Sequence, residues 1–81
     1  MNRATERRCN LTARVKVWAE GRTIADIADD VGVGEFTVWR WLHGRGTRDL
    51  HERTGEALAR AMGLVDENGR PDTEALYAPL G

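Results

Sequence analysis

The stretch GRTIADIADDVGVGEFTVWRWLHG, residues 21–44, decides the fold of this chain. Thr23 is followed three residues later by Asp26, and this capping box predicts the start of a helix. Gly32 then predicts its end, because glycine adopts the left-handed conformation that closes many helices. Between them, apolar side chains recur at the spacing of one helix face: Ile24, Ile27, Ala28 and Val31.

A second short helix follows after a tight turn. Gly34 is an acceptable N-cap residue. Val38, Trp41 and Leu42 then lie at positions i, i+3 and i+4, which places them on one face. We therefore expect a helix over residues 34–43 that packs back on the first one, so that the pair forms a corner of two helices.

The rest of the chain predicts further helices on either side of this pair. Apolar spacing favours one over residues 10–20 with Asn10 as its N-cap, one over 49–62 that begins at Asp49, and one or two turns over 72–77. No segment has the pattern of a β-strand. A chain of 81 residues makes one small domain, so we expect a compact all-α fold of four to five helices.

Three parts of the chain differ in character. Residues 1–9 carry several arginines and predict a basic N-terminal arm, either mobile or continuous with the first helix. Residues 10–63 contain the helical pattern just described. Residues 64–81 form a C-terminal extension with a turn and a short helix.

Composition excludes several classes of function. Cys9 is the only cysteine, so no internal disulfide can form, and this favours a reducing, cytoplasmic setting. No apolar run approaches the roughly 18 residues of a membrane span, and no secretory signal begins the chain. His43 and His51 are eight residues apart and lack a metal-ligand spacing. There is no glycine loop for phosphate and no nucleophile beside a base. We expect no enzyme activity, no metal, no cofactor and no small-molecule ligand.

Charge is distributed unevenly along the chain, although the net charge is only −1. Residues 1–48 hold nine Lys/Arg against six Asp/Glu, whereas residues 49–81 hold three against seven. The chain therefore has a basic front and an acidic back. This polarity is compatible with a nucleic-acid partner for the front half.

The offsets within the corner are typical of a helix-turn-helix. Ala28 is small where two helices must cross, Gly32 lies at the turn four residues later, and Val38 and Trp41 are the apolar anchors that follow. Residues 22–63 resemble the lambda-repressor-like family (Cro/repressor, XRE-type) of DNA-binding domains. The resemblance lies in TIADIADDVGV, TVWRWLHG and EALARAMGL. It implies that residues 34–43 form a recognition helix in the major groove. The family often has serine at position 34 and a polar residue at position 39, where this chain has glycine and tryptophan.

The outward face of residues 34–43 supplies the candidates for base contact, which are Glu35, Phe36, Trp39 and Arg40. An arginine fork fits the O6 and N7 atoms of guanine, so Arg40 is expected to read a base or hold a phosphate. Glu35 either accepts from a cytosine amino group or stabilises the helix N-terminus. Phe36 belongs either to the core or, partly exposed, near a thymine methyl group, and Trp39 either faces DNA or packs on protein.

Phosphate contacts are expected from the rim of the motif. The candidates are Arg22, Thr23, Thr37, Arg45 and Arg48. The arginines of the N-terminal segment could follow a groove or be ordinary tail charges. These are Arg3, Arg7 and Arg8.

These features predict sequence-specific binding of double-stranded DNA by a small transcriptional regulator, of a kind found in phages and mobile elements. One recognition helix offers few contacts, so a homodimer on a pseudo-palindromic site is expected. The C-terminal extension offers apolar residues that either form the dimer surface or cover the core: Leu64, Val65, Leu76, Tyr77 and Leu80. Two alternatives stay open. One is an excisionase or recombination-type accessory protein, and the other is a protein-binding helical module such as an antitoxin.

Overall fold

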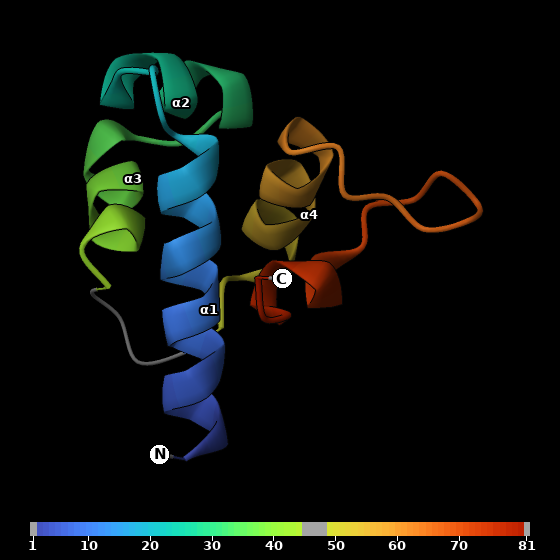
Figure 1. Ribbon diagram of the computed structural model, residues 1–81. Coiled ribbons are helices and arrows are strands. Elements are labelled where there is room, and N and C mark those ends of the chain that lie inside the picture. The colour runs from blue at the N-terminus through green and yellow to red at the C-terminus, as the bar shows by residue number, and fades with distance from the viewer. Residues whose placement is uncertain (1, 45–48, 81) are drawn as a thin grey trace.

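The computed structural model describes residues 2–44 and 49–80, and this part of the chain is helical (Figure 1). It forms four α-helices and one 3₁₀ helix in the order α1 (Arg3–Trp18), α2 (Ile24–Val31), α3 (Glu35–Leu42), α4 (Glu52–Ala61) and η1 (Thr73–Tyr77). An isolated bridge between Val65 and Pro71 is the one β-type pairing within these residues. The expected all-α class is confirmed. No helix in the described ranges is long and apolar enough to cross a membrane.

Helix α1 runs through the middle of the molecule and is longer than the sequence suggested. It begins at Arg3, and the Asn2 side chain caps it by accepting a hydrogen bond from the Thr5 N–H at 2.8 Å. Residues 3–9 are thus the helical extension and not a separate arm. The assignment of Asn10 as the N-cap is wrong, because its side chain instead donates to the Tyr77 carbonyl at 2.9 Å. An amide at that position can reach the C-terminal segment only after the chain has folded.

Helices α2 and α3 lie against each other at one end of α1 (Figure 1). The Thr23 hydroxyl accepts a hydrogen bond from the Asp26 N–H at 3.1 Å, which confirms the predicted cap. Gly32 closes α2 with φ of 83°, and its N–H and that of Val33 both donate to the Ala28 carbonyl. Gly34 then begins α3 without a side-chain cap. The chain therefore turns within the three residues between α2 and α3.

The core lies where α1, α2, α3, α4 and η1 meet. Its largest fully buried side chains come from each of these elements and are Val15, Ile27, Val38, Leu58 and Leu76. Trp41 is 5% exposed, so the expected inward orientation of this side chain is confirmed. Leu42 is half-buried at the edge of the same cluster.

Helix α4 begins later than the sequence suggested. His51 is its N-cap residue, and its ring accepts from the Arg53 N–H, so the assignment of Asp49 as the cap is wrong. Asp49 is instead held by Arg7, with an oxygen 2.8 Å from the guanidinium. That ion pair draws the residue toward α1 and away from the first turn of α4.

The C-terminal extension packs on α1 and α4. Asp72 caps η1 by accepting a hydrogen bond from the Ala75 N–H at 3.3 Å, as the sequence predicts. Leu76 is fully buried and Tyr77 is 8% exposed, so these two side chains cover the core and the expectation of a dimer surface fails for them. Leu64 is half-buried against the same cluster, whereas Val65 and Leu80 are 50% and 45% exposed.

Candidate functional site

The outer face of α3 is the most distinctive surface of the molecule. Val38 and Trp41 turn into the core, with 0% and 5% exposure. A helix has 3.6 residues per turn, so Phe36 and Arg40, four residues apart, lie together on the opposite face. Phe36 is 70% exposed, and Arg40 is also exposed. A large aromatic side chain and a cation thus share the surface opposite the buried stripe.

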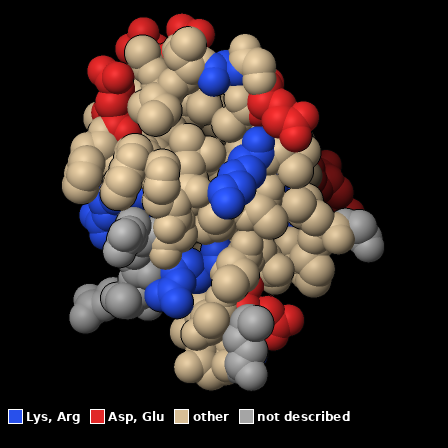
Figure 2. Space-filling model, turned by 60° about the vertical axis from the view of Figure 1, so that its left-hand side comes forward, with Lys and Arg blue, Asp and Glu red and all other residues tan. Residues whose placement is uncertain are grey.

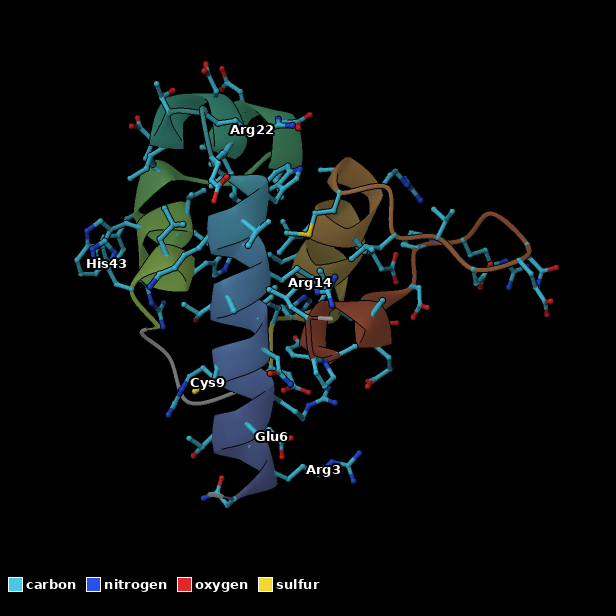
Figure 3. The ribbon with its side chains drawn as sticks, in the orientation of Figure 1. Arg3, Glu6, Cys9, Arg14, Arg22 and His43 are labelled. Atoms are coloured by element: carbon cyan, nitrogen blue, oxygen red, sulfur yellow. The ribbon has the colours of Figure 1, made fainter. Side chains whose placement is uncertain are left out.

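Three aromatic rings stack along this face. The Phe36 and Trp39 rings lie 5.7 Å apart between centroids and 8° from parallel. The Trp39 and His43 rings follow at 4.2 Å and 20°. The His43 ring also approaches the Trp39 carbonyl, with Nδ1 2.9 Å from the oxygen. We call these three residues the aromatic stack. Figure 3 shows His43 projecting from α3 on the side away from α1.

The aromatic stack shows what Trp39 packs against, which the sequence left open. Trp39 is half-buried between its two neighbours, so it packs on its own helix while its edge stays accessible. His43 was expected only as a surface histidine, and its place in the stack was missed. The spacing of positions 36, 39 and 43, at i, i+3 and i+7, is the signal that could have found it.

Charged groups flank the aromatic stack. Glu35 is exposed in the first turn of α3, where a carboxylate favours the helix N-terminus. Arg40 is exposed in the last turn, and no carboxylate among residues 2–44 and 49–80 lies within ion-pair distance of its guanidinium. Its five N–H donors are therefore available to a ligand.

The rim beside α2 is less suited to phosphate than expected. The Arg22 guanidinium lies 3.7 Å from a carboxylate oxygen of Asp30 and 4.8 Å from the centre of the Trp18 ring. The Thr23 hydroxyl accepts the cap hydrogen bond of α2 and keeps its O–H as a donor, whereas Thr37 is half-buried. Acidic side chains gather at the top of the face in Figure 2 with a basic side chain beside them, and further Lys and Arg lie below. The surface over α2 is therefore the more acidic part of this face.

The arginines of the first turns of α1 have different surroundings. Arg3 is exposed at the start of the helix, and Arg8 is half-buried. Arg7 lies on the side of α1 that faces η1 and pairs with Asp49 and Glu74 at 2.8 Å and 2.9 Å. Arg45 and Arg48 lie outside the described residues. Arg7 is therefore committed to contacts within the protein.

A cluster of side chains around Arg7 joins three segments of the chain. We call it the clasp, and its members are Arg7, Asp49, Glu74 and Tyr77. The Arg7 guanidinium also lies 4.1 Å from the centre of the Tyr77 ring, and the Tyr77 hydroxyl accepts from the Leu50 N–H at 2.8 Å. The hydrogen bonds that the Arg7 guanidinium donates to Asp49 and Glu74 raise the pKa of Arg7. The same contact with Arg7 lowers the pKa of Glu74, and burial raises the pKa of Tyr77. The clasp fixes η1 against α1.

Comparison of the chain with models of protein families, with curated proteins and with solved structures finds no match. Within the described ranges, no group of three or more His, Cys, Asp or Glu side chains is placed to hold a metal ion. The exposed Phe36 ring and the aromatic stack make the outer face of α3 the candidate site.

Proposed function

We propose that this chain binds double-stranded DNA with sequence specificity, as a small transcriptional regulator, and that α3 enters the major groove. The observation that carries the proposal is the division of α3 into a buried face and an exposed one. Val38 and Trp41 fix the helix to the core, while Arg40 and the aromatic stack point to solvent. Rigid presentation of a short helix is what reading a groove requires.

The dimensions of α3 agree with this role. Its eight residues give a length of about 12 Å at 1.5 Å per residue. An α-helix with its side chains is about 10–12 Å across, so α3 fits the width of the major groove, which is about 12 Å. The corner with α2 keeps the N-terminal end of α3 accessible, because Gly34 has no side chain to obstruct it.

Each exposed side chain then has a defined task. Arg40 donates two hydrogen bonds to the O6 and N7 atoms of a guanine. Phe36 contacts a thymine methyl group, which is the apolar feature of the major groove. Glu35 accepts from a cytosine amino group at the entrance of the helix.

We extend the proposal to the lambda-repressor-like arrangement and to a homodimer. Helix α4 follows α3 along the chain, as this family requires, whereas a winged excisionase would continue with a β-hairpin. This order favours the regulator over the recombination accessory protein. Two copies would bind half-sites about 34 Å apart, or a multiple of that distance.

A specific observation favours a second candidate function, a module that binds another protein. Phe36 is 70% exposed and stacks on Trp39, and aromatic residues are enriched at protein interfaces. An antitoxin-type domain would use the same face of α3 for a partner chain. This function predicts no binding of a DNA duplex at any salt concentration.

Selection of bound duplexes from a random pool tests the first proposal. The recovered sequences should share a motif, and the logarithm of the affinity should fall linearly with the logarithm of salt concentration. Absence of duplex binding at 50 mM salt would refute the proposal and leave the protein-binding module as the better account.

Arg40→Ala then tests the assignment within the motif. Loss of a bidentate contact to guanine costs about 1–3 kcal/mol, so the affinity for the selected site should fall about 5- to 140-fold. Arg60→Ala is the matched control, because Arg60 is likewise exposed in the last turn of a helix, α4. Equal effects of the two substitutions on sequence preference would show that Arg40 reads no base.

A further inference from the structure

A second basic surface lies on α1 beside the end of α3. Arg8, Thr12 and Lys16 recur every four residues, so they share one face of the helix over about two turns. We call these three residues the α1 stripe. They border a shallow depression of about 370 Å³ whose other lining residues are Cys9, Ala13 and Gly44.

The α1 stripe adjoins the face of α3. Gly44 directly follows His43, the last ring of the aromatic stack. A Cβ atom at Gly44 would lie 3.6 Å from the Thr12 hydroxyl, so the end of α3 abuts the middle of the stripe. Figure 3 shows Cys9 and His43 on the same side of α1, with Arg14 on the other side. The two surfaces therefore form one continuous face.

Of the two cations of the α1 stripe, Lys16 is exposed and Arg8 is half-buried. No described carboxylate lies within ion-pair distance of the Lys16 ammonium group. On the other side of α1, Arg7 is held in two ion pairs and Arg14 donates to the Ala78 carbonyl. In Figure 2, Lys and Arg side chains run down the face below the acidic side chains over α2. Arg8 and Lys16 thus place positive charge along α1.

We infer that the α1 stripe binds the phosphate backbone of the DNA strand that flanks the groove entered by α3. This inference rests on the proposed function. Arg8 and Lys16 are eight residues apart, which is about 12 Å along α1. That length reaches two separate phosphates of one strand, whose nucleotides follow at about 3.4 Å of rise. The Thr12 hydroxyl donates to a phosphate oxygen between them.

The stripe replaces contacts that the rim of α2 does not supply. Arg22, the described cation of that rim, lies 3.7 Å from a carboxylate oxygen of Asp30. Phosphate contacts fix the register of a recognition helix without reading sequence. The α1 stripe would therefore set how α3 lies in the groove, while Arg40 distinguishes one base from another.

Salt dependence of binding tests the inference. Each phosphate contact contributes about 0.9 to the slope of log affinity against log salt. Lys16→Ala should lower that slope by about 0.9, and the Arg8→Ala/Lys16→Ala double variant by about 1.8. The factor by which Lys16→Ala weakens DNA binding should consequently be about 3.5-fold smaller at 200 mM salt than at 50 mM salt. Affinity for the selected duplex and for a scrambled duplex should fall by the same factor.

Arg70→Ala is the matched control, because it removes one exposed cation from the turn that extends away from α1 (Figure 1). Its slope should equal that of the parent. If Lys16→Ala also keeps the parental slope while the parent binds DNA, the inference is wrong and the proposed function stands. If the parent binds no duplex, both are wrong. Lys16→Gln provides the same test should the double variant fail to fold.

Cys9 gives an independent readout on the unsubstituted protein. It is exposed, borders the depression and is the single cysteine of the chain. Bound DNA over the stripe should slow alkylation of Cys9 by a maleimide at least severalfold relative to the free protein. An unchanged alkylation rate in a saturated complex would overturn the inference.

Discussion

Trp41→Ala should destabilise this protein more than any substitution on the outer face of α3. Trp41 is 5% exposed, so nearly all of its side-chain surface is removed from water. A buried tryptophan removes about 150–250 Å² from water. At about 25 cal/mol per Å², that area corresponds to about 4–6 kcal/mol. Alanine retains the Cβ atom, so the expected loss is about 3–5 kcal/mol.

Thermal unfolding followed by circular dichroism measures this loss. A domain of 60–100 residues loses roughly 4–8 °C of melting temperature per kcal/mol. The Trp41→Ala variant should therefore melt at least about 12 °C below the parent. Because small domains are stable by only about 5–15 kcal/mol, part of the variant population should be unfolded at 25 °C if the parent lies near the lower limit.

Trp39→Ala is the control, since it makes the same chemical change two residues earlier in α3. Trp39 is half-buried and contacts Phe36 and His43 on the solvent side of the helix. Its loss should cost about 1 kcal/mol, the value of an aromatic pair. The inward orientation of Trp41 is refuted if Trp39→Ala costs as much, or if Trp41→Ala melts cooperatively at the parental temperature.

Two further predictions concern the turn before α3 and the clasp at Arg7. Gly32→Ala should lower the free energy of unfolding by about 1–2 kcal/mol in a denaturant titration, because Gly32 has φ of 83° and an L-residue is strained there. Gly34→Ser, at φ of −75°, should be neutral or slightly stabilising because serine adds a cap. Equal losses of stability in the two variants would contradict this reasoning. Arg7 lowers the pKa of Glu74 below its ordinary 4.5, so the stability that this pair contributes is present above that pH and is lost as pH falls through the lowered value. The melting temperature of Glu74→Gln should therefore approach that of the parent between pH 4.5 and pH 2, and a constant difference from pH 7 to pH 2 would exclude this role for the pair.

The sequence by itself determined the corner of α2 and α3. Thr23, Gly32 and Gly34 act on backbone groups within a few residues of themselves, so the bounds of these helices follow from local chemistry. Val38 and Trp41 were assigned to the core from helical spacing alone. The same spacing left Arg40 on the outer face, where the structure has it.

Only the tertiary structure decided the role of residues whose partners are far away in the chain. Arg7 has the local surroundings of a tail cation, yet its partners Asp49 and Glu74 are 42 and 67 residues distant. Tyr77 has an apolar ring that suits an interface or a core equally well, and burial against α1 and α4 settled the choice. Short-range patterns specify helix ends and faces, whereas long-range partners are set by how the helices pack, which no local pattern encodes.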